Sequence, residues 1–407
     1  MPSKPPEGQP APADGALPPA ARVGLGTRPF GVYIHVPYCT TRCGYCDFNT
    51  YTPFDSGGHA GIGTFVDAIA GEVRLAREVL GDVEVPVSTV FVGGGTPTLL
   101  PSEDLSRLLR LIDGEFGLVP GAEITTEANP ESVDAAGLER LVAGGYTRVS
   151  FGMQSARPHV LAALDRHHTP GRVPDVVDWA RKAGFADVSL DLIYGAPSES
   201  PSDWQASLDA VVELAVDHVS AYALVVEDGT TMARRVRRGE LLAPDDDVLA
   251  DRYLAAEETL AAAGHSWYEI SNWARTPTSR ARHNLGYWRS DDWWGFGPGA
   301  HSHVGGVRWW NVRHPAAYAA RVAGGVSPAR AREVLDQATQ QLERVMLGLR
   351  LRDGLALDEL TPAGFAAARE ALTDGHLEAE PFAAGRAVLT LNGRLLADGV
   401  AAALLPD

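Results

Sequence analysis

The sequence predicts an α/β protein: a partial (β/α)6 barrel followed by a small winged-helix-like α+β domain. Between residues 30 and 225, apolar β-branched segments alternate with amphipathic helical segments, a pattern typical of βαβ units and a parallel sheet. Polar residues also lie at or just after the expected strand ends, where barrel folds place their chemistry. After residue 330, helical patterns lead to an apolar segment with an Asn-Gly turn signal, which predicts helices followed by a hairpin.

Six expected strands define the barrel, and each is rich in β-branched or aromatic residues. They cover residues 31–36, 88–94, 122–129, 148–154, 188–195 and 218–224. Single amphipathic helices separate them. The chain has 407 residues, which suffices for one large domain and one small one.

The composition changes three times along the chain. We expect a disordered Pro/Ala-rich tail at 1–28, because that stretch cannot bury enough apolar surface to order itself. The barrel is expected at 29–265, and an aromatic and Gly-rich connecting region at 266–330. Its WRSDDWWGFGPG stretch is interpreted as the seam between the barrel mouth and the C-terminal region. The winged-helix-like domain is expected at 331–407.

The charge balance argues against nucleic-acid binding. The chain carries 52 acidic and 35 basic residues, a formal net charge of −17. One basic stretch, ARRVRRGE at 233–240, stands out, and we interpret it as a solvated helix end. No run of about 18 apolar residues predicts a transmembrane helix, and the first residues hold no apolar signal-peptide core. We therefore expect a cytoplasmic protein.

All three cysteines fall in PYCTTRCGYCDF: Cys39, Cys43 and Cys46. An odd number of crowded cysteines cannot form a disulfide framework. Three soft thiolates on one loop suit a [4Fe–4S] cluster, which would keep one iron open to chelate a small molecule. The alternative is a zinc site completed by His35 or Asp47, although structural zinc usually takes a second ligand pair further along the chain.

The C-x3-C-x2-C spacing, with Tyr45 before the last cysteine, resembles the loop of the radical S-adenosylmethionine (SAM) superfamily. Six segments in order are similar to the oxygen-independent coproporphyrinogen oxidase-like group of that superfamily: YIHVPYCTTRCGYCDF, FVGGGTPTLL, TTEANPES, SFGMQS, LDRHHT and DLIYGAP. The resemblance covers roughly residues 30 to 400. It implies a radical SAM barrel in which SAM binds the open iron and can yield a 5′-deoxyadenosyl radical.

The resemblance also implies a SAM site. Glycines let the backbone approach the methionine moiety, carboxylates accept hydrogen bonds from the amino group and the ribose, and the guanidinium of Arg166 matches a carboxylate. The positions that match SAM contacts of the family are Tyr33, Gly94, Gly95, Thr96, Glu127, Gln154, Arg166 and Asp191. No residue is assigned as catalytic, and whether SAM is cleaved is left open.

Two functions fit the resemblance. One is an oxygen-independent coproporphyrinogen III dehydrogenase, and the other is a haem chaperone of the HemW type. The dehydrogenase motif continues to a fourth cysteine, but here that position is Phe48, which speaks against the dehydrogenase. A third alternative is another radical SAM enzyme that modifies a tetrapyrrole.

The segment HNLGYW matches the H-N-x-x-Y-W pattern of the haem-binding relatives, in which a neutral imidazole would serve as an axial ligand. Its expected haem-binding residues are His283, Asn284, Tyr287 and Trp288. The alternative is that His283 is a hydrogen-bonded core residue. The expected partners are haem and an acceptor, for which the family suggests a respiratory membrane protein, and a homodimer is left open.

Overall fold

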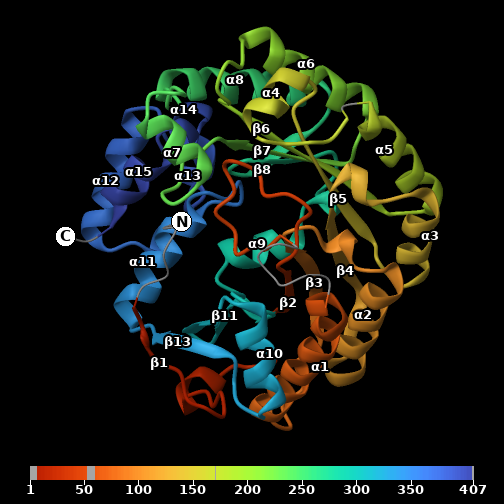
Figure 1. Ribbon diagram of the computed structural model, residues 1–407. Coiled ribbons are helices and arrows are strands. Elements are labelled where there is room, and N and C mark those ends of the chain that lie inside the picture. The colour runs from red at the N-terminus through yellow and green to blue at the C-terminus, as the bar shows by residue number, and fades with distance from the viewer. Residues whose placement is uncertain (1–6, 53–59, 170, 406–407) are drawn as a thin grey trace.

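A computed structural model describes residues 7–52, 60–169 and 171–405 (Figure 1). Its centre is a run of six parallel strands in which each strand pairs with the next one in the sequence. The strands are β2 (Phe30–Val36), β3 (Val87–Gly94), β4 (Leu118–Ala128), β5 (Arg148–Gln154), β6 (Asp187–Tyr194) and β7 (His218–Ala223). The expected partial (β/α)6 barrel is confirmed.

Helices surround this run of strands on the outside (Figure 1). They are α1 (Ala60–Leu80), α2 (Ser102–Phe116), α3 (Ala135–Ala143), α4 (Pro158–Ala163), α5 (Arg172–Ala183), α6 (Pro201–Leu214) and α8 (Asp246–Ala262). Apart from α4, whose Val160 belongs to a smaller cluster, their buried apolar faces share one core with the strands, as parallel sheets require because both faces must be covered. None of the helices among the described residues is long and apolar enough to span a bilayer.

The aromatic region 266–330 extends both edges of this sheet. On one side β10 (Asp292–Phe296) pairs parallel with β2 and is followed by β11 (His301–Val304), β12 (Val307–Asn311) and β13 (Ala329–Val334). On the other side β7 pairs with β9 (Asn272–Ala274), which pairs with β8 (Ser266–Glu269). The interpretation of WRSDDWWGFGPG as a seam is wrong for its centre, because DWWGF is strand β10. The expected boundary at residue 331 falls inside β13.

The expectation of a disordered tail is wrong for residues 7–28. β1 (Gln9–Pro10) pairs with β13, a 3₁₀ turn spans Pro19–Arg22, and Ala21 is fully buried. The Arg22 side chain donates to the Leu80 carbonyl at the end of α1. This composition has no core of its own, but it orders by packing on the barrel. Residues 1–6 lie outside the described residues.

The C-terminal part forms a separate core. Its elements are α11 (Gln337–Gly348), β14 (Leu355–Ala356), α12 (Pro362–Thr373), α13 (Ala379–Ala383), β15 (Arg386–Ala387), α14 (Leu391–Leu395) and α15 (Ala397–Leu404). The expected Asn-Gly hairpin is wrong: Thr390 accepts a hydrogen bond from the Gly393 N–H and caps α14, so the dipeptide starts a helix. The small sheet instead pairs β14 with β15.

A buried carboxylate fastens the β10–β13 extension to the barrel. Glu72 of α1 is 1% exposed and accepts hydrogen bonds from the Gly297 N–H (2.9 Å), the Asn311 amide (2.7 Å) and the Tyr318 hydroxyl. Tyr318 lies on α10 (Pro315–Ala323). Burial raises the pKa of Glu72 to about 7, against the lowering effect of these donors. One side chain therefore joins α1, β12 and α10.

We predict that Glu72→Ala lowers the free energy of unfolding by about 3 kcal/mol, because three buried donors lose their acceptor. Chemical denaturation of the purified protein measures this change. Glu78→Ala, at an exposed position of the same helix, is the matched control and should change stability by less than about 0.5 kcal/mol. Equal effects of the two substitutions would contradict the fastening role.

Candidate functional site

The three cysteines lie on the loop that follows β2, over the carboxyl ends of the barrel strands (Figure 1). The loop is closed at its base, where Cys39 N–H donates to the Tyr51 carbonyl (3.1 Å) and Tyr51 N–H donates to the Pro37 carbonyl (2.7 Å). Cys46 N–H donates to the Cys43 carbonyl (3.2 Å). All three thiols are free and partly exposed. The loop therefore presents them together at the barrel mouth.

The surroundings of the thiols fit thiolate ligands. The Arg166 guanidinium lies 3.7 Å from Cys43 Sγ, and the Thr96 hydroxyl lies 3.8 Å from Cys39 Sγ. Burial raises the pKa of Cys39 and raises that of Cys46 to about 11, and the Thr96 hydroxyl opposes the rise at Cys39. A bound metal cluster would therefore favour the thiolates. His35, considered as a zinc ligand, has both ring nitrogens engaged, with the Tyr33 hydroxyl and the Asn49 carbonyl at 2.9 Å each. The donor set that remains suits an iron–sulfur cluster better than a zinc ion.

Three consecutive glycines, Gly93 to Gly95, let the end of β3 lie close to Glu127, to β2 and to the start of the cysteine loop. A Cβ on Gly93 would lie 2.7 Å from a Glu127 oxygen, one on Gly94 would lie 2.6 Å from the His35 ring, and one on Gly95 would lie 2.5 Å from the Tyr38 carbonyl. Gly94 also has a φ of +110°. Gly95 N–H donates to the Val36 carbonyl at 2.8 Å. A side chain at Gly95 would push the start of the cysteine loop away, whereas side chains at Gly93 and Gly94 would displace Glu127 and His35.

Two carboxylates face the inside of the barrel. Glu127, at the end of β4, accepts a hydrogen bond from the Gly94 N–H (3.0 Å). Asp191 of β6 accepts from the Ser150 hydroxyl (2.9 and 3.0 Å). Burial, together with a smaller effect of the negative charge of Asp191, raises the pKa of Glu127 to about 8 against the lowering effect of the Gly94 hydrogen bond. Burial also raises the pKa of Asp191. The lumen is therefore built to receive positive charge.

Arg166, Gln154 and Tyr33 complete the same space. The Arg166 guanidinium donates to the Gly152 carbonyl at 3.1 Å, and a Cβ on Gly152 would meet both Arg166 and Gln154 at 2.9 Å. Gln154 ends β5 with a φ of +62°. Tyr33 lies deeper, close enough to Glu127 for that charge to raise the pKa of its hydroxyl, although burial raises it more. The eight residues expected at a SAM site thus share the mouth and lumen of one barrel.

Several residues of the site escaped the sequence interpretation. Ser150 and Ser220 both donate to Asp191, and Asn49 donates its side-chain amide to the Pro298 and Arg313 carbonyls (2.9 and 2.8 Å). The strand period gave a signal for Ser150, because it alternates with Gly152 and Gln154 along β5 and so faces the lumen with them. No local signal marks Asn49.

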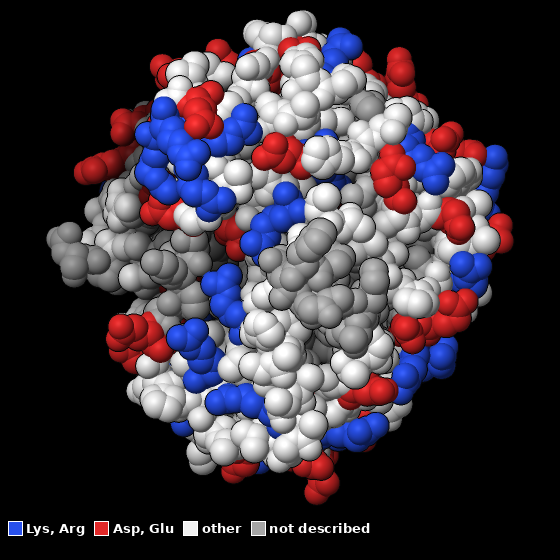
Figure 2. Space-filling view, viewed as in Figure 1, with Lys and Arg blue, Asp and Glu red and all other residues white. Residues whose placement is uncertain are grey.

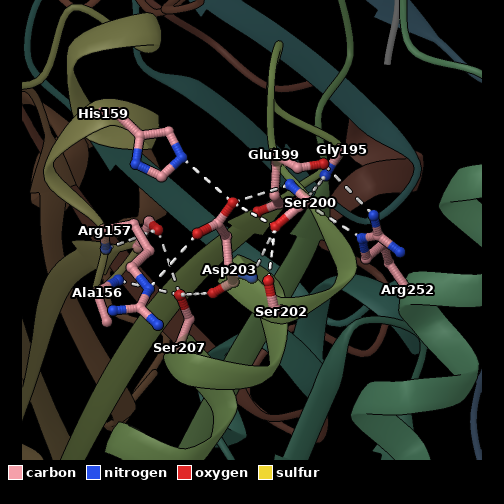
Figure 3. A network of polar contacts seen from close by, with 11 residues as sticks. Ala156, Arg157, His159, Gly195, Glu199, Ser200, Ser202, Asp203, Ser207 and Arg252 are labelled. Carbon is pink, nitrogen blue, oxygen red and sulfur yellow. Dashed lines mark hydrogen bonds and ion pairs between the residues drawn. The ribbon is translucent and has the colours of Figure 1, made fainter.

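A polar network holds the ends of β5 and β6 in place (Figure 3). Ser200 and Asp203 form a capping box at the start of α6, and the Ala156 N–H donates to the Ser207 hydroxyl (3.0 Å). Glu199 accepts from the Gly195 N–H (2.8 Å) and faces Arg252 at 3.6 Å. These contacts fix the loops that follow Gln154 and Asp191.

His283 lies on the opposite side of the lumen. It belongs to α9 (Arg282–Trp288), which sits inside the barrel in Figure 1, and its ring contacts residues near the amino ends of β2 and β3. The imidazole is 3% exposed, with Nδ1 2.8 Å from the Thr89 hydroxyl and Nε2 2.8 Å from the Tyr287 hydroxyl. Burial lowers its pKa to about 3. We call α9 the floor of the barrel.

The expected haem ligand is therefore not free in this conformation. Both ring nitrogens of His283 are hydrogen-bonded, Tyr287 completes that contact, and Trp288 donates to the buried Glu269. A cavity of about 220 Å³ reaches His283 and Tyr287 from outside, which is smaller than usual ligand pockets. Asn284 is half-buried. The sequence could not reveal the Thr89 contact, since that partner lies 194 residues away.

We predict that His283→Ala lowers the free energy of unfolding by about 3 kcal/mol, because Thr89 and Tyr287 are left without their buried partner. His301→Ala, at an exposed position on β11, should cost less than about 0.5 kcal/mol. Urea unfolding of both variants checks the difference. A His283→Ala protein as stable as the wild type would show that the imidazole does not hold the floor.

Comparison with known proteins identifies the family to which this chain belongs. Residues 33–211 match the family model described as the radical SAM superfamily. The chain is 53% identical to "Heme chaperone HemW" of Mycobacterium tuberculosis over 379 residues, which is 93% of this chain and 95% of the relative. It is 35% identical to the protein of that name from Synechocystis, over 83% of this chain and 82% of the relative.

Among solved structures, the coproporphyrinogen III oxidase HemN of Escherichia coli, a radical SAM enzyme, superposes with a TM-score of 0.80. It is 22% identical, over 95% of this chain and 92% of that one, so the likeness shows the fold alone. The spacing of the cysteines, the glycine contacts beside their loop and the sequence identity over nearly the whole chain all indicate the same family. The chain belongs to the HemW family of the radical SAM superfamily.

Proposed function

We propose that this protein is a haem chaperone, which binds haem and transfers it to an acceptor protein, built on a radical SAM scaffold. The observation that carries the proposal is the 53% identity over nearly the whole length of a relative named as a haem chaperone. Phe48 supports it. Its ring, 58% exposed, stands where the dehydrogenase group has its fourth cysteine, so the chain lacks that thiol.

Membership of the superfamily implies a [4Fe–4S] cluster and SAM. We assign the cluster to Cys39, Cys43 and Cys46, whose loop is tied to β3 by the Thr96 N–H and whose sulfurs lie near the Thr96 hydroxyl and the Arg166 guanidinium. When bound, the cluster supplies an open iron for SAM and an electron for its cleavage. Cys43→Ala should lose the cluster iron, and iron retained at the wild-type level would contradict this assignment.

The lumen carboxylates suit the cationic end of SAM. Glu127 and Asp191 are costly to bury as anions, and a sulfonium or ammonium group nearby would offset that cost. Arg166, which reaches toward Cys43 and the end of β5, suits the methionine carboxylate. Gly94, Gly95, Thr96, Gln154 and Tyr33 enclose the remaining space.

We predict that SAM binding releases a proton and tightens as the pH rises from 6 to 8. In the free protein the pKa of Glu127 is about 8, so its carboxyl group is mostly protonated between pH 6 and 8. A bound cation favours the ionised carboxylate, so binding of SAM releases the proton. Affinity should therefore rise at most about tenfold per pH unit. Calorimetry on reconstituted protein in two buffers of different ionisation enthalpy counts the protons.

Glu127→Gln should bind SAM more weakly and with a flat pH dependence, because the neutral amide cannot gain charge. Glu139→Gln, at an exposed site on α3, serves as the control and should retain the wild-type profile. Proton release that persists in Glu127→Gln would assign the titration to another group.

We propose that haem coordination by His283 is coupled to opening of the barrel floor. The imidazole becomes a ligand only when its contact with Thr89 or Tyr287 breaks. Glu123 holds the start of α9 as well, accepting from the backbone N–H groups of Arg282 (2.8 Å) and His283 (3.1 Å). Because only a small fraction of the molecules has an open floor, the apparent affinity for haem is reduced by that fraction.

An anaerobic haem titration tests both parts of the proposal. Wild type should bind one haem, His283→Ala should lose or shift the Soret band, and Thr89→Val should bind roughly fivefold more tightly, since it removes about 1 kcal/mol from the closed floor. Unchanged affinity in Thr89→Val would refute the coupling. Unchanged spectra in His283→Ala would place the ligand elsewhere. Absence of saturable binding by wild type would overturn the chaperone function.

We propose that the acceptor is a haem-binding respiratory membrane protein and that the chaperone works in the cytoplasm. The absence of a spanning helix among the described residues is compatible with this role. A homodimer is part of the proposal, since a second subunit would double the surface available for handover. Analytical ultracentrifugation with and without haem tests that point.

A further inference from the structure

The cavity of about 220 Å³ that reaches His283 lies at the end of the barrel opposite the cysteine loop. Pro29 and Ser88, which line it, stand at the amino ends of β2 and β3, whereas the cysteine loop follows the carboxyl end of β2. Tyr287 and Trp293 line it as well, with ring centroids 4.8 Å apart, and we call these two rings the aromatic wall. The cavity thus brings aromatic surface and an imidazole together.

On the lumen side, aromatic rings cover the same imidazole. The Phe91 ring of β3 stacks on His283 with the ring centroids 5.2 Å apart, and the Tyr33 ring of β2 lies 6.4 Å away. A planar ligand that came from the barrel mouth would have to displace both rings. The outer side of the floor is therefore the more accessible approach to His283.

Two exposed arginines, Arg282 and Arg289, border the cavity on this outer side. Arg282 begins α9, and Arg289 is the residue that caps its carboxyl end. They are seven residues apart, which is about two helical turns, so their side chains project from the same side of the helix. One short helix therefore carries His283 and a guanidinium group at each of its ends.

Neither guanidinium is bound tightly within the protein. Arg289 meets Asp353 at 2.8 Å, but the two side chains are 47% and 48% exposed, and such exposed ion pairs are weak. Arg282 donates to the Gly121 carbonyl at 2.6 Å and faces Glu123 at 3.8 Å. A carboxylate of a ligand can therefore compete for both arginines.

The contacts of Asp353 indicate what kind of group fits beside Arg289. Asp353 lies between α11 and β14 in the C-terminal part, and its carboxylate faces Arg289 at 2.8 Å and Arg280 at 3.8 Å. A carboxylate thus already occupies the rim of the cavity, held by two cations from the segment around α9. A carboxylate on a ligand in the cavity would meet the same guanidinium groups.

The overall charge of the protein does not attract an anion. The net charge is −17, and on the cysteine-loop face basic and acidic side chains are both scattered over the surface (Figure 2). Asp291 and Asp292 also line the cavity, although Arg28 pairs with Asp292 at 2.8 Å. An anionic ligand therefore needs specific guanidinium contacts, which Arg282 and Arg289 can supply.

We propose that haem binds at the outer side of the floor with its two propionate groups on Arg282 and Arg289, and that Asp353 is the internal carboxylate with which they compete. The proposal rests on the proposed haem-binding function and adds the orientation of the haem. The iron faces His283, the porphyrin packs on the aromatic wall, and the propionates lie at the rim. The planar guanidinium group matches the geometry of a carboxylate.

The test compares haem with haem dimethyl ester, which keeps the iron and the ring but carries no propionate charge. Titrations in one detergent-containing buffer, followed at the Soret band, give the affinity for each ligand. The rim variant is Arg282→Gln with Arg289→Gln. The control variant is Arg107→Gln with Arg140→Gln, on α2 and α3, where both arginines are exposed and each pairs with one carboxylate. The ratio of the two affinities cancels general effects of the substitutions on folding.

Wild type and the control variant should prefer haem to the ester by about tenfold, since each exposed ion pair contributes roughly threefold. The rim variant should bind the two ligands within about twofold of each other. Asp353→Asn should increase the preference for haem roughly threefold, because the propionates no longer compete with a carboxylate. This change is opposite to that of the rim variant, so a loss of folding cannot produce both.

A rim variant that keeps the wild-type preference would overturn the proposal, and so would a wild type that binds haem and the ester equally well. An unchanged preference in Asp353→Asn would overturn the competing role of that carboxylate. If the wild type bound neither ligand saturably, the haem-chaperone function itself would be refuted, and the assignment of the two arginines with it.

Discussion

The close approach of Gly93, Gly94 and Gly95 to their neighbours, which are Glu127, the end of β2 and the start of the cysteine loop, is the constraint on which the rest of the site depends. The three missing side chains leave room for Glu127, for His35 and for the backbone that begins the loop at Tyr38. Hydrogen bonds from Gly95 and Thr96 N–H to the Val36 and Tyr38 carbonyls then fix the loop on β3. A loop that must hold three thiols at fixed spacing gains its rigidity from this backbone contact and not from a core of its own.

The barrel interior is polar at both ends, but for different purposes. Near the mouth, burial and then the negative charge of Asp191 raise the pKa of Glu127, and burial raises the pKa of Asp191. At the floor, His283 is buried and both of its ring nitrogens are hydrogen-bonded to residues of the barrel. Buried polar groups that hydrogen-bond to one another stabilise a closed arrangement. Buried carboxylates that lack a counter-charge are typical of a ligand-binding site. The same barrel can thus hold a cofactor at one end and keep the other end shut until cargo arrives.

The alternation of strands and helices was enough to predict the partial barrel, because both faces of a parallel sheet must be covered and the resulting pattern is long and regular. The positions of Glu127 and Gln154 near the ends of β4 and β5 followed from the same pattern. Contacts that join distant segments could not be predicted. Ala21 is buried by packing on the barrel, and His283 is held by a residue of β3. In each case a tertiary partner, and not local composition, decides the outcome.

The proposed function is that the radical SAM scaffold of this protein serves the handover of haem. The most direct measurement is the rate at which haem leaves the loaded protein for a membrane cytochrome b apoprotein in nanodiscs, compared with its loss to excess apomyoglobin. Direct handover predicts a rate that rises with the concentration of the cytochrome and exceeds the passive loss. A rate equal to the passive loss at every acceptor concentration would contradict a chaperone and leave only a protein that binds haem.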